Sequence, residues 1–225
     1  MITPDLDRAM QHLTAANFTR RRLLSAAGIT IGGAAFASMP LMATAQADGT
    51  PVTEAEAMMF ASPVDVLNYA LTLEHLEAAF YRDGLAAIGE AGITGLGFQP
   101  SVFVTLTTIG DNEATHVATL TQVITDLGGE PVAEATYDFG YTDAAGFLQV
   151  AQALEDTGVA AYQGAAQYLI DEDALLTAAL TIHGNEARHA AYLALLNGTS
   201  PFPEAFNPTL TPEEVLEIAG PFIAG

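Results

Sequence analysis

Apolar residues recur at helical spacing in four long segments of the chain, and polar or glycine-rich stretches separate these segments. Capping residues mark the ends of the segments. Ser62 followed by Pro63 is typical of a helix start, Gly128 is typical of a helix end, and Asp171 caps the last segment. The predicted helices are residues 62–84, 101–127, 142–170 and 171–196.

The connections between the predicted helices differ in length. Residues 85–100 are rich in glycine and predict a loop with one short turn of helix at most. Residues 130–142 show no helical apolar stripe, and an extended connection of about 13 to 16 residues at about 3.3 Å per residue reaches roughly 45–50 Å. This distance exceeds the length of the helices, about 33–42 Å at a rise of 1.5 Å per residue. The second connection can therefore cross the whole length of a helix bundle.

This pattern predicts an all-α fold, a four-helix bundle with a long crossover between the second and third helices. Half of the residues are apolar and only 15% are charged, which excludes a disordered chain. We expect one domain over residues 62–198. The remaining tail, residues 199–225, carries one short helix from Thr211 to Ala219, with a proline at its first position.

The N-terminal segment has the features of an export signal. Residues 19–25 read Thr-Arg-Arg-Arg-Leu-Leu-Ser and lead into a weakly hydrophobic stretch rich in alanine and glycine. This pattern resembles the twin-arginine signal, with Arg20 and Arg21 as the recognition pair and the twin-arginine translocase as partner. An Ala-x-Ala pattern ending at Ala47 predicts cleavage there, and a second one ending at Ala45 is the alternative.

Cleavage after residue 47 implies a signal peptide over residues 1–47, a flexible linker over 48–61 and a periplasmic or secreted protein. The alternative is an uncleaved membrane anchor, which the glycines of the stretch disfavour. Twin-arginine export carries folded proteins. This route therefore suits a protein that takes up its cofactor before it crosses the membrane.

Charge and cysteine content narrow the function classes. The chain has 27 acidic and 6 basic residues and a formal net charge of −21, so nucleic acid and anionic membrane surfaces are poor partners. It has no cysteine, which excludes disulfides and thiolate ligands. Any metal ion must therefore be held by carboxylate and imidazole groups. The composition leaves open whether the chain forms a homo-oligomer.

Two Glu-x-x-His pairs are the strongest chemical signal. Glu113 and His116 lie in the second predicted helix, and Glu186 and His189 lie in the fourth. Residues three apart share one face of a helix, so each pair can bind the same ion. One such pair is weak support for a metal site, whereas two pairs on alternate helices are strong support.

The other two helices repeat a second pattern, a glutamate followed seven residues later by a tyrosine. Glu74 and Tyr81 form this pattern in the first helix, and Glu155 and Tyr162 form it in the third. Seven residues are nearly two turns, so each tyrosine can donate a hydrogen bond inside the core behind the metal ligands. Glu77, one turn from Glu74, is either a supporting acid or a rival ligand.

Burial of four glutamates in a bundle core is strongly unfavourable unless cations neutralise them. Two divalent ions balance four carboxylates, and oxygen-rich ligation with one imidazole per ion suits iron or manganese. Three further polar residues are candidate partners for the imidazoles: Asp111, Asp156 and His183.

Together, these segments resemble the ferritin-like domain family, which includes bacterial members exported by the twin-arginine route and plant desiccation-related proteins. The resemblance covers residues 60–200 and lies in residues 67–81, 113–129, 154–164 and 182–195. It implies the same ligands for two metal ions that the spacing predicts: Glu74, Glu113, His116, Glu155, Glu186 and His189. It implies little about activity.

Three functions follow from such a centre. It is an oxidoreductase whose metal pair reacts with oxygen or peroxide, or it binds and stores metal without turnover. The alternative is a stress-protective or structural helical protein whose metal site is non-redox or vestigial. The residues favour metal binding over any particular reaction.

Overall fold

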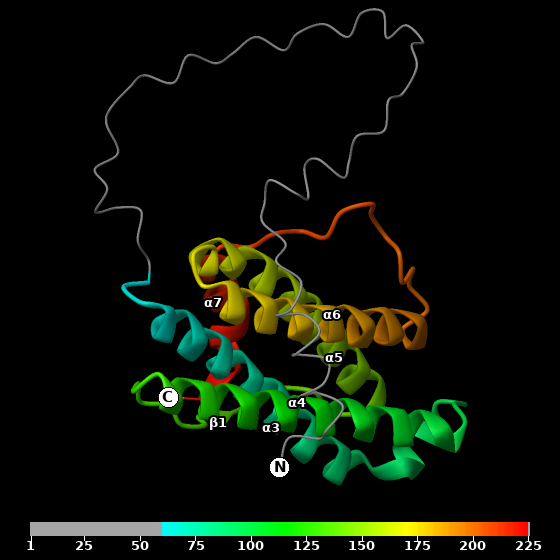
Figure 1. Ribbon diagram of the computed structural model, residues 1–225. Helices are drawn as coiled ribbons and strands as arrows, with labels where there is room; N and C mark the ends of the chain where they lie inside the picture. Colours follow the sequence, from blue (N-terminus) through cyan, green and yellow to red (C-terminus); the bar gives the residue numbers. More distant parts are fainter. Residues whose placement is uncertain (1–59, 225) are drawn as a thin grey trace, which may run out of the picture. The chain divides into compact units, whose positions relative to one another are not determined.

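Five helices account for most of residues 60–224, the part of the chain that the computed structural model describes (Figure 1). The predicted signal peptide, residues 1–47, lies outside these residues, as does the predicted linker apart from residues 60 and 61. The helices are α3 (Pro63–Gly95), α4 (Pro100–Asp126), α5 (Ala144–Ala165), α6 (Asp173–Leu196) and α7 (Pro212–Ala219).

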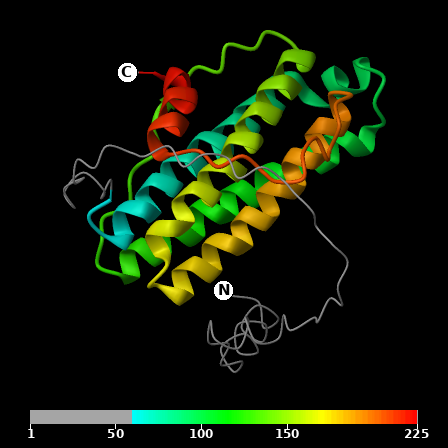
Figure 2. The same cartoon turned by 90° about the horizontal axis from the view of Figure 1, so that it is seen from above.

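The four long helices form two hairpins that pack against each other. Short loops join α3 to α4 and α5 to α6, and the members of each pair are in extensive contact. The long connection over residues 127–143 runs back along the bundle, so α4 and α5 point in the same direction (Figure 2). The predicted all-α bundle with its long crossover is therefore confirmed.

Side-chain caps fix where several helices begin. The Ser62 hydroxyl accepts a hydrogen bond from the Asp65 amide at 3.3 Å, and the Asp143 carboxylate accepts one from the Gly146 amide at 2.8 Å. Thr211 forms a complete capping box at the start of α7. Each of these starts lies within one or two residues of the predicted one.

The predicted end of the first helix at Gly84 is wrong, because α3 continues to Gly95. Gly84 is buried, and a Cβ atom at this position would collide with the ring of Phe147 in α5. This glycine therefore permits close packing of two helices and does not end one. A kink follows at Gly89, whose φ of 64° is accessible to glycine at little cost.

The junction between α5 and α6 also differs from the prediction. The α-helix ends at Ala165 and a 3-10 turn, η2 (Ala166–Leu169), follows it. The Glu172 amide then donates to the Leu169 carbonyl at 2.9 Å, which keeps this segment in a tight turn. As a result α6 begins at Asp173, and Asp171 is not its cap.

A short strand pair connects the crossover to the end of the chain. Strand β1 (Thr136–Tyr137) pairs antiparallel with β2 (Ile223–Ala224), which follows the 3-10 turn η3 (Gly220–Phe222). Helix α7 packs on α5. The C-terminal segment therefore covers one side of the bundle and holds the crossover in place.

The apolar core is interrupted by a level of buried polar side chains. Its smaller apolar cluster lies toward the start of α3 and the end of α4 and includes Leu71, Leu120 and Ile182. The larger cluster includes the parallel stacked rings of Phe80 and Phe147, whose centroids are 4.6 Å apart.

Within residues 60–224, no helix combines the length and the apolar character needed to cross a membrane.

Candidate metal centre

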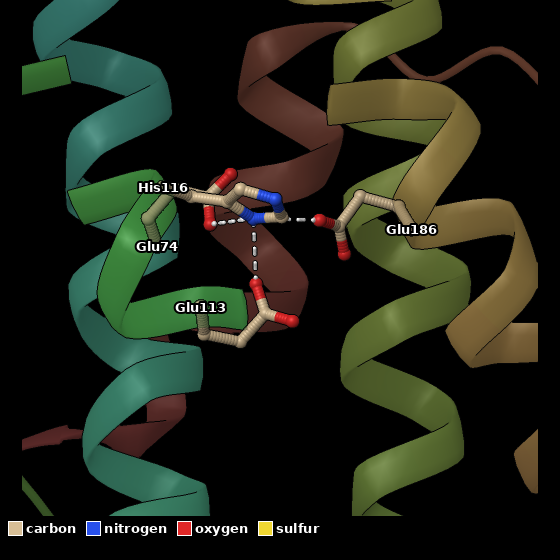
Figure 3. Close-up of side chains that lie close together, drawn as sticks. All are labelled: Glu74, Glu113, His116 and Glu186. Atoms are coloured by element: carbon tan, nitrogen blue, oxygen red, sulfur yellow. Dashed lines mark hydrogen bonds and ion pairs between the residues drawn. The ribbon is translucent and has the colours of Figure 1, made fainter. Parts of the chain in front are cut away.

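All six predicted ligands lie at one level of the bundle and are buried. The four glutamates are fully buried, and His116 and His189 are 8% and 4% exposed. Each long helix contributes one glutamate, and α4 and α6 add the histidines one turn further on. Figure 3 shows four of the six ligands, Glu74, Glu113, His116 and Glu186. The spacing that predicted this convergence is therefore matched by the packing of the four helices.

The ligand atoms form two groups of four that share two carboxylates. Within each group, one ligand atom from each residue lies within 4.8 Å of the others. Glu113 and Glu186 belong to both groups. Glu74 and His116 complete one group, and Glu155 and His189 complete the other: each half of the repeat supplies the same residue types. This arrangement fits two neighbouring ions, with Glu113 and Glu186 between them.

Both imidazoles face the carboxylates through Nδ1. Nδ1 of His116 lies 2.9 Å from Glu113 Oε2 and 3.1 Å from both Glu74 Oε2 and Glu186 Oε1 (Figure 3). Nδ1 of His189 lies 2.9 Å from Glu113 Oε1 and 3.2 Å from Glu155 Oε2. A single nitrogen surrounded by two or three carboxylate oxygens marks, in each half, the place where a cation would be bound.

Three buried oxygens of the shared carboxylates accept no hydrogen bond of good geometry, although two of them lie 2.9 and 3.1 Å from a histidine Nδ1. They are Glu113 Oε1 and both side-chain oxygens of Glu186. Buried polar atoms are nearly always hydrogen-bonded in folded proteins, because an unsatisfied one is costly. Positive charge between the helices would satisfy these oxygens, so the residues fit a pair of metal ions.

Burial dominates the electrostatics of the glutamates. It raises the pKa of Glu74 to about 8, helped by the charges of Glu186 and Glu113 and opposed by His116. Burial also raises the pKa of Glu155, and raises that of Glu186 well above its usual range. For Glu113, burial is again the largest single effect, but the contacts and charges of both histidines together outweigh it and lower the pKa.

The histidines respond in the opposite way. Burial alone would lower their pKa values, but hydrogen bonds to the carboxylates outweigh it. The pKa of His116 rises to about 12 and that of His189 to about 10. Without metal, the centre therefore holds protons at neutral pH, and these protons must leave when a cation binds.

The two tyrosines hydrogen-bond to ligands, and each one reaches across the bundle. Tyr81 on α3 donates to Glu155 Oε1 on α5 at 2.6 Å, and Tyr162 on α5 donates to Glu74 Oε1 on α3 at 2.5 Å. Burial, with the nearby carboxylate charges, raises the pKa of both hydroxyls well above its usual value, so they remain donors. The repeat predicted these donors but not the exchange of partners between helices.

The sequence patterns did not identify two asparagines that lie beside His189. Its Nε2 lies 3.1 Å from the side-chain amide of Asn112 and 2.5 Å from that of Asn185. Both contacts are made by the amide nitrogens Nδ2. An imidazole that binds metal through Nδ1 keeps its proton on Nε2, and it can donate that proton to either asparagine once the amide turns to present Oδ1. The sequence does contain a pattern that could have identified them, since an asparagine directly precedes the glutamate of each Glu-x-x-His pair.

The three candidate partners named from the sequence do not take this role. Asp111 and Asp156 are exposed on the outer faces of α4 and α5. His183 is half-buried, and its Nε2 has no hydrogen-bond partner. Asp111 and Asp156 lie on the wrong faces of their helices, because positions one or two residues from a ligand point away from it. His183 is three residues from Glu186, but its Nε2 reaches neither ligand imidazole.

Glu77 is a fifth buried glutamate and lies outside both ligand groups. In the repeat, its counterpart on α5 is Gly158, and a Cβ atom there would lie 3.0 Å from Glu77 Oε1. The glycine therefore leaves room for this carboxyl group. Burial, together with the charges of Glu186 and Glu155, raises the pKa of Glu77 well above its usual range.

The positions of Glu74 and Glu77 predict different metal contents for the matched substitutions Glu74→Gln and Glu77→Gln. Glu74→Gln removes a charged ligand of one group and should reduce bound metal from about two ions per chain to about one. Glu77→Gln replaces a protonated carboxyl group with an amide of the same shape and should leave metal content unchanged. Elemental analysis of the purified variants measures both. Loss of metal in Glu77→Gln, with none in Glu74→Gln, would reverse the assignment.

Comparison with known proteins agrees with the fold and the centre. A family model described as a ferritin-like domain matches residues 62–199, which is more than half of the chain and contains every candidate ligand. A comparison with curated proteins finds no match. The match over the whole bundle shows that the chain belongs to the ferritin-like domain family.

Proposed function

We propose that this protein binds two iron or manganese ions in the bundle core and that the loaded centre reacts with oxygen or peroxide. The observation that carries the proposal is the pair of ligand groups that share Glu113 and Glu186. Helix bundles with two Glu-x-x-His helices and two single-glutamate helices are built to hold such ion pairs. Carboxylate oxygens with one imidazole per ion suit iron and manganese better than copper.

Charge balance supports two divalent ions. Four ionised ligand glutamates carry the charge that two divalent cations neutralise, and histidine ligates in its neutral form. Glu77 adds no charge while it is protonated. Among the ligand oxygens, those that accept no hydrogen bond of good geometry all belong to the two shared carboxylates, Glu113 and Glu186.

The residues around the ligands hold them in place. Tyr81 and Tyr162 fix the orientation of Glu155 and Glu74, and the two asparagines fix the ring of His189. The helices exclude bulk water from the ligand carboxylates. When bound, a redox-active ion pair supplies the electrons that reduce oxygen or peroxide.

Export forms part of the same proposal. The arginine pair Arg20 and Arg21 supports passage through the twin-arginine translocase to the periplasm or beyond. A protein exported in the folded state can cross with its ions already bound. This property suits a site whose ligands are all buried in the bundle.

Metal analysis followed by an optical titration tests the proposal. Protein purified from cells that express the full chain should contain about two ions per chain by elemental analysis. Metal-free protein loaded with ferrous iron under nitrogen should then change its near-ultraviolet absorbance when oxygen or peroxide is added. The same titration with manganous ion identifies which metal supports the reaction.

Two results would contradict the proposal. A chain that contains no iron or manganese when purified from cells, and binds neither ion when loaded afterwards, lacks the predicted centre. A chain that holds two ions but is inert toward both oxidants is a binding or protective protein, and the redox part of the proposal fails.

A further inference from the structure

A largely enclosed cavity of about 40 Å³ lies inside the bundle, between the first turns of α3 and the last turns of α4. Its walls come from all four long helices and are almost entirely aliphatic. Several of these wall residues are alanines, including Ala70 and Ala179. Small side chains at these positions leave the space open where larger ones would fill it.

The cavity offers water no free hydrogen-bond donor and almost no polar surface. The two hydroxyl groups in its lining belong to Thr119 and Tyr162, and both are donated elsewhere. Thr119 donates to the Thr115 carbonyl at 2.8 Å, and Tyr162 donates to Glu74. A cavity retains water only where two or more polar groups can bind it, so this one should be dry and open to small apolar molecules.

The cavity lies one helical turn from the candidate metal ligands. Its lining includes Ala70, Leu120 and Ile182, which are each four residues from a ligand on their own helix. Four residues correspond to about 6 Å along a helix. On α5, the cavity meets Tyr162, whose hydroxyl is bonded to Glu74.

The opposite side of the centre is different. Tyr81, the counterpart of Tyr162 in the repeat, borders a wider and more open cavity of about 540 Å³. Charged side chains from Arg82, Asp111 and Glu134 line it, so water and polar solutes can enter. The two halves of the centre share their ligand types but face a dry space on one side and a polar one on the other.

We propose that the apolar cavity is a binding site for molecular oxygen, which it holds next to the candidate metal centre. Oxygen is a small apolar molecule and gains from leaving water for a dry aliphatic space. Hydrogen peroxide would lose its hydrogen bonds there and has no reason to enter. This inference rests on the proposed function for its chemical purpose, while the binding site itself can be tested without metal.

Xenon tests the cavity directly. It is an apolar probe that occupies dry cavities, and crystals of the metal-free protein pressurised with xenon should show one atom among these side chains. Ala179→Leu should exclude it. Ordered water in the wild-type cavity, or the absence of xenon, would overturn the inference whatever the metal chemistry proves to be.

The choice of oxidant tests the role of the cavity. In protein loaded with ferrous iron, Ala179→Leu should slow the absorbance change caused by oxygen by about tenfold and leave that caused by peroxide within about twofold. Ala70→Val fills the same space from α3 and should also slow the reaction with oxygen. It replaces Ala179→Leu in the experiment if that variant folds poorly. Ala174→Leu, an exposed site on the same helix, is the control and should change neither rate.

The outcomes are distinguishable. If wild-type protein responds to neither oxidant, the proposed function fails and xenon alone decides whether the cavity binds apolar gas. If wild-type protein responds to oxygen and a variant that excludes xenon responds equally fast, oxygen reaches the centre by another route and the proposal is wrong. Equal slowing with both oxidants would also contradict it, because the effect would then lie at the metal ligands.

Discussion

Replacing Glu186 with alanine should reduce bound metal from about two ions per chain to one or fewer and abolish any reaction with peroxide. Glu186 belongs to both ligand groups, so its removal weakens both positions at once. It also leaves His116 without one of its three carboxylate neighbours. Glu74→Gln touches one group only, and the contrast between the two variants tests whether Glu186 is shared.

Glu172→Ala is the matched control on the same helix. Glu172 is exposed, occupies the N-cap position of α6 and makes no capping hydrogen bond through its side chain. Its removal should leave metal content and the peroxide response as in wild type. If Glu186→Ala also retained two ions per chain, the six-ligand assignment would fail, and a helical protective protein with an inert site would become the better description.

The sequence patterns could predict that these side chains converge, because each pattern rests on helical geometry alone. Residues three apart in Glu-x-x-His, and seven apart in the glutamate–tyrosine repeat, lie on one helix face whatever the neighbouring helices do. Bundle packing then brought the four faces to one level. The choice between Glu74 and Glu77 needed the rotation of α3 about its axis, which spacing does not specify.

Other features depend on contacts between segments distant in sequence. Gly84 is of the residue type that often ends a helix, but its role is set by the ring of Phe147, more than sixty residues away. The pairing of Thr136 with Ala224 involves two residues on each side, too few for any period-two pattern. The exchange of tyrosine partners likewise requires knowing that α3 and α5 face each other across the core.

Removing the metal should lower the melting temperature, and the loss should grow as pH rises. A ligand present at 100 times its dissociation constant stabilises the native state by about 2.7 kcal/mol per site. Two such sites correspond to roughly 10–20 °C in melting temperature for a domain of this size. Thermal unfolding followed by circular dichroism, with and without chelator, measures the difference.

The pH dependence follows from the direction of the pKa shifts in the metal-free centre. Glu74, Glu77, Glu155 and Glu186 have raised pKa values, as do His116 and His189. A group whose pKa is higher in the native state binds its proton more tightly there, so stability is lost as pH rises from the unfolded value toward the folded one. Glu113, with its lowered pKa, is the one ligand that acts in the opposite direction.

The window for the measurement lies between about pH 6 and pH 8.5, where exposed carboxylates stay ionised throughout. Within it, the metal-free protein should become less stable, because it spans the pKa of about 8 for Glu74 and begins to approach that of about 10 for His189. Metal binding displaces these same protons, so the affinity for metal rises with pH and the holo protein should lose less stability. The gap between holo and metal-free melting temperatures should therefore widen toward pH 8.5 in wild type and in Glu172→Ala. In Glu186→Ala, which binds less metal, the gap should be smaller than in wild type at every pH. A gap that narrows with pH would mean that the buried glutamates and histidines are not the groups from which metal displaces protons.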